Sequence, residues 1–500
     1  MKKIILSFLT FGLGFQAQAQ QTILQERNYL PQPNYTQIGA SAVDKNGNIF
    51  YSGATTVSGG NYSNRFLLVK PNADTLWTKR NPVTLVLPNQ SVLTLKSGQY
   101  VAGGNRLNQS TPAITLQQLD QFGSFVRTNL FTKPTMVNIM LALPNKSMYL
   151  GGGSGRFMEF SFMHTDSLGN LLWDKDYSWH INDRFVDMKF ARNGDIVGAG
   201  NTPYPVGPYH IKLMRVNQQG DSLDAKQLIV TNPSRNESMS PNFNSITALT
   251  DSGFLITAAT DTTTATASVS MGMVVKVDSA FNVQWHYVHR TPALETYVFT
   301  KARELTDGSV LVLGFKQAPI SGANLNGFQL YHFDQQGQLI NTYPFTSNIC
   351  SQVWGLTFDN LADGSFMIGG RCGNNPPVSF GFYVANVKVA GLPPVVPPFN
   401  VPAITGMKEE TFLAGITLGQ SYPNPTTSEA IIPYSLPKNY NKASIIVQEI
   451  ASGREIRKYE LKRNSSSLTV DLSNLNSGLY LYSLVVDDRP LATKKLAVMK

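Results

Sequence analysis

The chain has 500 residues, of which 42% are hydrophobic and 15% are charged, and its formal net charge is +9. This length suggests two or three domains, because single hydrophobic cores stop growing near roughly 250–300 residues. The positive charge is not gathered into a dense run of lysine and arginine, which argues against a nucleic-acid partner.

The first 19 residues predict a secretory signal peptide. Lys2 and Lys3 form a basic start, residues 4–15 form an apolar stretch, and Ala17 and Ala19 occupy the small-residue positions before a cleavage site. The stretch is too short to span a bilayer, and the alternative to a signal peptide is a membrane anchor or a buried helix. No later segment has about 18 uncharged apolar residues in a row, so we expect no transmembrane segment in the mature chain.

A polar turn followed by an apolar burst recurs seven times along the next 330 residues or so. The copy at 191–200 reads ARNGDIVGAG, and the others are DKNGNIFYSG, LKSGQYVAGG, LPNKSMYLGG, LTDSGFLITAA, LTDGSVLVLG and LADGSFMIGG. The predicted turn positions are Gly47, Gly98, Asn145, Gly194, Gly253, Gly308 and Gly364. Glycine and asparagine tolerate the positive φ of a tight hairpin, and the apolar burst predicts a buried strand.

A second strand-turn-strand phrase follows each burst, for example FMHTDSLGNLLWDKD at 162–176. Each unit of about 50 residues therefore contains two hairpins, or four strands. Seven such units predict an all-β fold, a seven-bladed β-propeller over residues 20–389. The two-residue period excludes an α-solenoid.

The last repeat lacks its fourth strand, because the chain turns to proline after GFYVANVKV. The segment TILQERNY at 22–29 lies near the missing position ahead of the first repeat. We expect it to pair as the outer strand of the seventh blade, which closes the ring and removes an exposed edge.

Tryptophans recur at a nearly fixed distance from the next turn. Trp77, Trp173 and Trp285 precede the following turn position by 21, 21 and 23 residues. Aromatic faces can stack on sugars, but a periodic apolar position is usually structural. We therefore interpret these residues as packing between neighbouring blades.

The chain contains only two cysteines, Cys350 and Cys372, on predicted neighbouring strands of one repeat. In an exported protein such a pair can form a disulfide, and the alternative is two separate buried thiols. Without clustered histidines they do not predict a zinc site.

One repeat position carries polar or basic side chains two residues before the turn of the second hairpin. It predicts either the solvated end of a strand or a ring of donors that faces an anionic ligand. The column consists of Lys70, Gln118, His164, Arg215, Lys276 and His332.

The sequence offers no recognised catalytic or metal-binding motif. It has no G-x-S-x-G segment leading into a helix and no H-E-x-x-H. His286 and His289 are three residues apart on a predicted strand, which places them on opposite faces. Asp44 begins a segment like a calcium loop, but Thr55 stands where the closing carboxylate is required, so a hairpin turn explains it better. We expect no cofactor and no metal.

Carboxylates of the kind that cleave glycosides are present as Asp183, Asp187, Glu295 and Glu304. The sequence does not place any two of them at a catalytic separation. An extracellular carbohydrate-active hydrolase or lyase therefore stays the alternative to a binding scaffold, and the presence of catalysis stays open.

The composition changes at residues 390–412, where LPPVVPPFNVP predicts a stiff, extended, proline-rich linker. Beyond it, alternating apolar residues and closely spaced turns predict a small antiparallel β-sandwich over residues 413–500.

Several residues of this segment form a recognisable pattern: Tyr422, Pro423, Asn424, Pro425, Gly453, Gly478, Tyr480, Lys494 and Lys495. With this pattern, roughly the last 80 residues resemble the type A C-terminal sorting domain of the type IX secretion system. The resemblance implies that the type IX translocon of the outer membrane reads residues 413–500. It also implies that the domain is usually removed, for which the linker is the expected place, and that the cargo is released or attached to the cell surface.

The repeats also resemble secreted bacterial propellers, a likeness of architecture that transfers no function. Together these features predict a secreted or surface-attached scaffold that binds an extracellular glycan or protein. Propellers bind where loops converge or in the central channel, so we expect the ligand there or near the insertions at 231–244, 261–270 and 317–327.

Overall fold

The chain divides into two compact units, Met1–Val401 and Pro402–Lys500. The computed structural model describes residues 20–32, 36–56, 62–84, 91–95, 97–106, 113–131, 135–154, 159–177, 183–203, 207–240, 244–263, 268–290, 295–317, 325–374, 379–398, 401, 417–436, 442–449, 455–461, 465–486 and 489–500. The predicted signal peptide, with Ala17 and Ala19, lies outside these residues.

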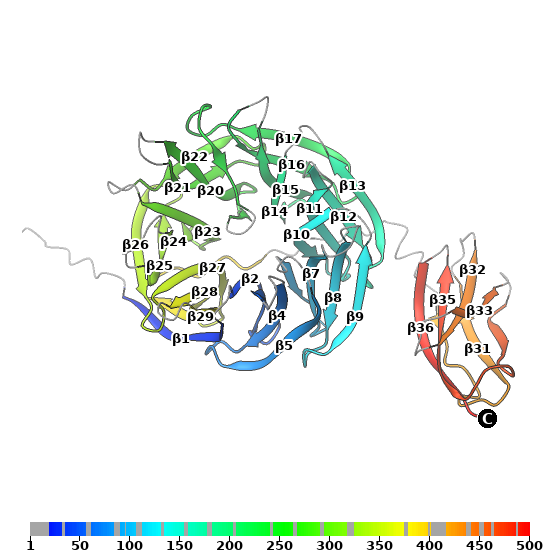
Figure 1. Cartoon of the computed structure of the whole chain (residues 1–500). Coiled ribbons are helices and arrows are strands. Elements are labelled where there is room, and N and C mark those ends of the chain that lie inside the picture. Colours follow the sequence, from blue (N-terminus) through cyan, green and yellow to red (C-terminus); the bar gives the residue numbers. More distant parts are fainter. Residues whose placement is uncertain are drawn as a thin grey trace, which may run out of the picture. The chain divides into compact units, whose positions relative to one another are not determined.

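The first unit is a ring of seven antiparallel sheets within the residues that the structure describes, which confirms the predicted propeller (Figure 1). In the first six blades the strands pair in chain order, with the earliest strand nearest the axis and the last strand outermost. The strands of the first six blades are β2 (Thr36–Val43), β3 (Ile49–Thr56), β4 (Tyr62–Val69) and β5 (Thr75–Thr84); β6 (Ser91–Thr94), β7 (Tyr100–Arg106), β8 (Ala113–Leu119) and β9 (Phe125–Phe131); β10 (Thr135–Ala142), β11 (Met148–Ser154), β12 (Glu159–Thr165) and β13 (Leu171–Tyr177); β14 (Arg184–Phe190), β15 (Ile196–Thr202), β16 (His210–Val216) and β17 (Ser222–Leu228); β18 (Glu237–Ser238), β19 (Ile246–Ala248), β20 (Phe254–Thr263), β21 (Ser268–Val277) and β22 (Val283–Val288); and β23 (Thr296–Glu304), β24 (Val310–Gln317), β25 (Gly327–Phe333) and β26 (Leu339–Thr346).

The seventh blade is built from both ends of the unit. It contains β27 (Gln352–Asn360), β28 (Phe366–Asn374) and β29 (Ser379–Val389). Its outer strand is β1 (Gln21–Gln32), which pairs antiparallel with β29 from Gln21↔Val389 to Gln32↔Phe380. The predicted closure of the ring by the segment at 22–29 is confirmed, and β29 is paired along both of its edges, by β28 and by β1.

The first hairpin turn of each repeat contains one residue with positive φ. This residue is the predicted glycine in five repeats. In the third and fifth repeats it is Lys146 (φ 71°) and Ser252 (φ 68°), so the predicted positions Asn145 and Gly253 are each wrong by one residue. The correct assignment matters because a shift of one residue along a strand exchanges its two faces.

The tryptophans pack between blades, as their spacing predicted. Trp77 on β5 donates its indole N–H to the carbonyl of Gln121 at 3.0 Å, and Trp285 on β22 does the same to Gln335. Their rings lie against the turn glycines of the next blade, where a Cβ at Gly123 or Gly337 would come within 3 Å of the indole. These contacts fasten β5 and β22 to the neighbouring blades.

Cys350, just before β27, and Cys372, on β28, form a disulfide with an S–S distance of 2.12 Å. The bridge joins two neighbouring parts of the seventh blade, the same blade that holds β1. Both cysteines are buried among residues of the sixth and seventh blades.

Part of the predicted linker packs on the propeller. The backbone N–H of Val396 donates to the carbonyl of Glu304 at 2.8 Å, and the N–H of Thr306 donates to the carbonyl of Pro394 at 2.8 Å. Val401 is buried beside Phe190 in the cluster between the third and fourth blades. We call residues 390–398 with Val401 the strap, and its yellow trace crosses the middle of the ring in Figure 1.

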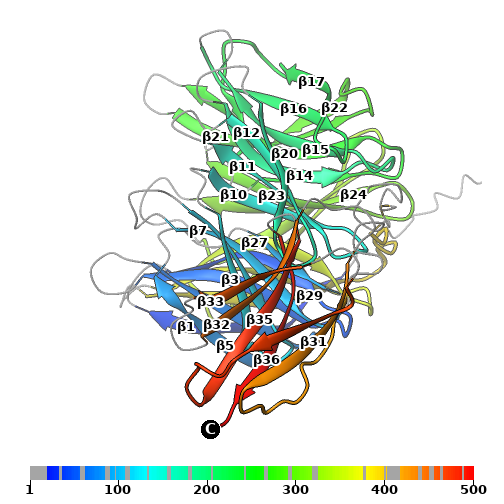
Figure 2. The ribbon, with the colours of Figure 1, turned by 90° about the vertical axis from the view of Figure 1, so that its right-hand side faces the viewer.

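The second unit consists of antiparallel strands, in keeping with the predicted sandwich. One sheet has the order β33 (Glu455–Glu460), β32 (Ala443–Glu449), β35 (Gly478–Val486) and β36 (Arg489–Val498), and these strands run side by side in Figure 2. The other has the order β30 (Thr417–Leu418), β31 (Glu429–Ser435) and β34 (Ser467–Asp471). Ile432, Ile445, Leu484 and Leu496 are among the side chains buried in its core.

Candidate functional site

The innermost strands place one residue from every blade in a ring around the propeller axis. Five of these strands show a β-bulge at the same repeat position, and the ring residue comes directly after it, as in Phe299/Lys301 of β23. All seven ring residues line one cavity of about 160 Å³, which we call the inner cavity. The ring consists of Ala40, Ser91, Ile139, Asp187, Ser245, Lys301 and Thr357.

A second ring lies two residues further along each strand, on the same strand face, and its members include Lys189, Arg303 and Asp359. These three side chains line the inner cavity and also a larger one of about 560 Å³, the mouth cavity. Charged residues of the two rings therefore come only from the fourth, sixth and seventh blades among the residues that the structure describes.

The fourth blade contributes a paired carboxylate and ammonium. Lys189 Nζ lies 3.1 Å from Asp187 Oδ1 and also donates to the Met188 carbonyl. Asp187 accepts further hydrogen bonds from the backbone N–H of Met188 at 2.8 Å and of Ile246 at 3.1 Å. Asp187 is thus held by two strands of neighbouring blades and has a structural role.

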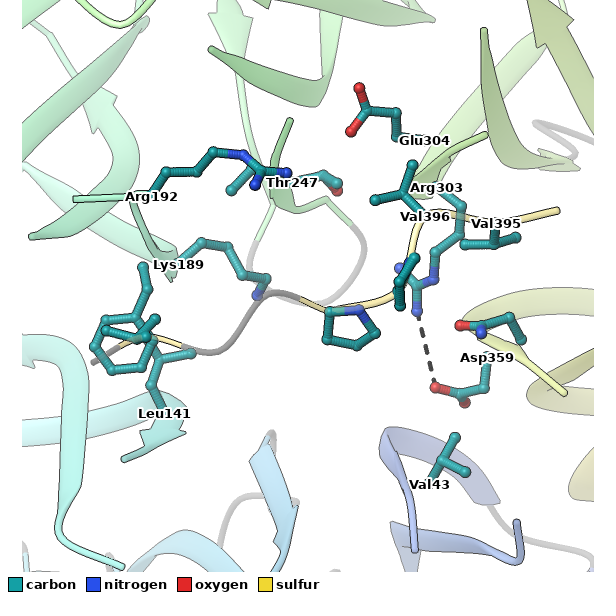
Figure 3. A pocket seen from close by; sticks show the side chains of 16 residues that line it. Val43, Leu141, Lys189, Arg192, Thr247, Arg303, Glu304, Asp359, Val395 and Val396 are labelled. Atoms are coloured by element: carbon teal, nitrogen blue, oxygen red, sulfur yellow. Dashed lines mark ion pairs between the residues drawn. The ribbon is translucent and has the colours of Figure 1, made fainter. Parts of the chain in front are cut away.

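The sixth and seventh blades meet through Arg303 and Asp359, whose closest charged atoms are 3.8 Å apart (Figure 3). Arg303 also donates to the Phe358 carbonyl and lies 5.4 Å over the Phe358 ring. Burial raises the pKa of Asp359, although the Arg303 guanidinium opposes that change. The contact joins two blades while leaving both side chains on the cavity wall.

Lys301 differs from these cations. No hydrogen bond or ion pair from the described residues reaches its ammonium group. Burial lowers the pKa of Lys301 to about 8, with Asp187 acting in the opposite direction. Among the described residues, Lys301 is therefore the one cation of the inner cavity that has neither a hydrogen bond nor an ion pair.

The strap covers part of the mouth cavity. Val395, Val396, Pro397, Pro398 and Val401 line it together with residues of the blades. Figure 3 shows Lys189 and Arg303 entering this cavity from two sides, with the strap between them. The wall is thus mixed, with apolar strap residues facing charged blade residues, and such a surface suits a ligand with both apolar and polar parts.

A separate hollow of about 630 Å³ lies at the predicted insertions 231–244 and 261–270. Its lining is polar and includes Asn232, Arg235, Asn236 and Asp261. Asn236 is engaged with the protein, because its amide contacts Asp261 at 3.3 Å and its oxygen accepts the Tyr209 N–H.

The predicted column of polar residues lies on the third strand of the blades or at its end. Its members line neither the inner cavity nor the mouth cavity, and most of them contact their own blade or the next one. His164 contacts Ser147 at 3.1 Å and stacks on Tyr149, and His332 contacts Ser309 at 2.9 Å. Gln118 bonds Gln99, Lys276 pairs with Asp251, and Arg215 donates to the Ser279 carbonyl, while Lys70 is exposed. Ligand binding by this column stays a prediction.

The four candidate carboxylates do not form a cluster. Asp183 pairs with Lys212, Glu295 pairs with Lys316, and Glu304 accepts from the backbone and hydroxyl of Thr250. Only Asp187 of the four lines the inner cavity. Each carboxylate therefore already has a donor or a cation as its partner.

Asp44 serves a hairpin turn, as we predicted. Its Oδ1 accepts the backbone N–H groups of Asn46 and Asn48, and its Oδ2 accepts the Tyr100 hydroxyl at 3.0 Å. No group of three or more His, Cys, Asp or Glu side chains that suits a metal ion occurs among the described residues. The described part of the chain also has no helix long and apolar enough for a membrane span.

In the second unit the structure brings two parts of the predicted sorting motif together. Asn424 donates to the Lys495 carbonyl at 3.0 Å and accepts the Ala497 N–H at 2.9 Å, so the Tyr422–Pro425 segment is fixed to β36. Lys494 and Lys495 lie on that strand. Tyr480 is buried on β35, which begins at Gly478, and Gly453 lies outside the described residues.

The sequence analysis did not identify the two rings of residues around the propeller axis. The signal was present, because the inner-ring residue stands seven positions before each positive-φ turn residue. The predicted turns at Asn145 and Gly253 hide this spacing. Each is one residue from the true turn, so counting back from it selects a residue on the opposite face of β10 or β19.

Comparison with known proteins matches residues 420–499 to the family model described as "Secretion system C-terminal sorting domain". No curated protein matches the chain. Among solved structures, the β-propeller domain of the Trilobed protease from Pyrococcus furiosus is 9% identical, with 75% of this chain and 99% of that chain covered and a TM-score of 0.39. Sqt1 from Chaetomium thermophilum is 10% identical, with 73% and 100% covered and a TM-score of 0.42.

Neither structure lends a ligand or an activity to this chain. The family match concerns the second unit, and the fold of the first unit is established separately. The blades, the closing strand β1 and the ring topology establish the propeller from the chain's own strand pairing. Residues 420–499 form a sorting domain of the type IX secretion system, and the protein is secreted through that system or attached to the cell surface.

Proposed function

We propose that this protein is an extracellular binding scaffold whose glycan or protein ligand occupies the mouth cavity of the propeller. The observation that supports this most is the convergence of six blades and the strap on one cavity of about 560 Å³. A closed ring fixes these side chains from many directions, which lowers the entropic cost of holding a ligand.

Binding is favoured over hydrolysis because the described carboxylates near the axis have other partners. Asp187 accepts two backbone N–H groups and contacts Lys189, and Asp359 lies beside Arg303. A glycosidase needs one carboxyl group as acid and a second as base or nucleophile, both facing the substrate. The alternative, a hydrolase or lyase, remains the second hypothesis for the experiment.

The test uses residues 20–500, the chain without its predicted signal peptide, with a panel of polysaccharides and glycoproteins. Ligands are detected by a rise in melting temperature, and the same samples are assayed for new reducing ends. Binding without product supports the scaffold, whereas product formation shows that the alternative is correct.

A matched pair of variants locates the site. Asn360 lines the mouth cavity, and Asn341 is exposed on the outer strand β26. Asn360→Trp should fill the mouth and abolish the ligand-induced rise, while Asn341→Trp should preserve it. Equal binding by both variants would place the ligand elsewhere, with the polar hollow near Asn232 as the next region to test.

A further inference from the structure

The charges of the inner cavity do not balance. Three cations, Lys189, Lys301 and Arg303, line it together with two carboxylates, Asp187 and Asp359. Lys189 contacts Asp187 at 3.1 Å, and Arg303 lies 3.8 Å from Asp359, so each carboxylate is matched by a cation. Lys301 is the remainder, with one positive charge and no partner among the described residues.

We propose that the inner cavity is a binding site for a single carboxylate, which the Lys301 ammonium group holds as its counterion. The proposal rests on the proposed function and deepens it, because it assigns the chemical class of the group that the ligand presents to the channel. The site is distinct from the predicted column, none of whose members lines this cavity.

The charge count favours a monoanion. One carboxylate would bring the five charged side chains and the ligand to neutrality. A phosphate monoester with two charges would leave an excess negative charge close to Asp187 and Asp359. The other five ring residues, Ala40, Ser91, Ile139, Ser245 and Thr357, are uncharged and supply no further compensation. In a narrow cavity with protein walls, such a mismatch is weakly screened.

A ligand reaches this position through the mouth. Lys189, Thr247, Arg303 and Asp359 line both cavities, so the two adjoin along this wall. A molecule seated against the strap can therefore extend a carboxylate toward Lys301. Two sources share this chemistry, the uronic acid of a saccharide and a free small organic acid.

The titration of Lys301 agrees with this role. Burial lowers the pKa of Lys301 to about 8, so the ammonium form still predominates at neutral pH. A bound carboxylate would stabilise that form. Carboxylate affinity should therefore be constant below pH 7 and should fall as the pH rises above 8.

The experiment measures binding by calorimetry to residues 20–500, the chain without its predicted signal peptide, at pH 7. The probes are glucuronate, glucose as its neutral analogue, acetate as the free acid and inorganic phosphate. The variants are Lys301→Met, Lys301→Arg to retain the charge, and Lys45→Met as the matched control. Lys45 is exposed in a hairpin turn and lines neither channel cavity. Melting of each unliganded variant verifies that it is folded.

We expect glucuronate to bind at least tenfold more tightly than glucose. Lys301→Met should weaken glucuronate at least tenfold, whereas Lys301→Arg should retain most of the affinity and Lys45→Met all of it. Glucuronate tighter than acetate identifies a saccharide acid as the source, and equal affinities identify a free acid.

Three results would overturn the proposal: no carboxylate binding by the wild type, undiminished binding by folded Lys301→Met, or phosphate bound more tightly than glucuronate. The proposed function fails separately. If a panel ligand still binds and Asn360→Trp removes it, the scaffold stands without the carboxylate site.

Discussion

The Tyr383 hydroxyl on β29 donates a hydrogen bond to the Glu26 carboxylate on β1 at 2.9 Å, across 357 residues of sequence. Glu26 also accepts the hydroxyl of Ser347 at 2.7 Å and the backbone N–H of Asn348 at 2.9 Å. One side chain of the closing strand thereby joins the outer edge of the seventh blade to the segment that leaves the sixth. The closure of the ring depends on this group as well as on the strand ladder.

Glu26→Ala should lower the free energy of unfolding of the propeller by roughly 2–3 kcal/mol, because three donors lose a charged acceptor. All five tryptophans precede residue 401, so their fluorescence reports on the propeller alone during urea unfolding. Leu24→Ala is the control, since Leu24 is exposed on the same strand and should change stability by less than about 0.5 kcal/mol. Equal effects of the two variants would show that Glu26 does not fasten the closure.

The buried imidazole of His164 should make the propeller sensitive to acid. Burial lowers the pKa of His164 to about 4, below its ordinary value of 6.5. The folded state therefore favours the neutral ring, and its stability contribution is complete above pH 6.5 and is lost as the pH falls toward 4. The loss should be roughly 2–3 kcal/mol.

His164→Gln should reduce this acid sensitivity. Glutamine is a suitable replacement because Gln118 occupies the same repeat position in the second blade and hydrogen bonds Gln99 at 3.1 Å. Urea unfolding at pH 7, 5.5 and 4.5, followed by tryptophan fluorescence, measures the change. A variant that loses as much stability on acidification as the wild type would assign the effect to other groups.

Lys301 should cost the unliganded protein stability. Its folded pKa of about 8 is below the ordinary 10.5, so the cost of burying the charge is full below pH 8 and disappears as the pH approaches 10.5. Lys301→Met should raise the free energy of unfolding by roughly 1–3 kcal/mol at pH 6.5 and by much less at pH 10. Denaturation at the two pH values tests this, and a variant less stable at both would contradict it.

The strap should remain with the propeller when the sorting domain is removed. Backbone hydrogen bonds of Pro394 and Val396 and the burial of Val401 hold it on the blades. We therefore expect that the propeller fragment from limited proteolysis, measured by mass spectrometry, ends beyond residue 398. Val401→Asp should expose the strap to cleavage before that residue, because it buries a charge among Phe190 and its neighbours. Pro398→Ala, at an exposed position, should leave the fragment unchanged; cleavage within 390–398 of the wild type would show that the strap is not held.

The sequence by itself determined the repeat, the number of blades, the closing strand and the sorting domain. The signals for these features are local, because each lies within one short segment. They are a turn residue that tolerates positive φ, as at Gly194, a two-residue apolar period, and a tryptophan at a fixed offset. The Asn424 and Lys495 segments were likewise recognisable before the structure joined them.

Only the tertiary structure decided the channel and its electrostatics. A bulge and the register of the turn decide whether Asp187 or its neighbour faces the axis. An error of one residue in either would place the neighbour there instead. Lys301 shares the inner cavity with Asp187 of the fourth blade and Asp359 of the seventh, and no local sequence pattern predicts that residues so distant in sequence meet there. The strap is a similar case: its prolines predict an extended segment, but its place on the ring is set by Glu304, Thr306 and Phe190, which are distant in sequence.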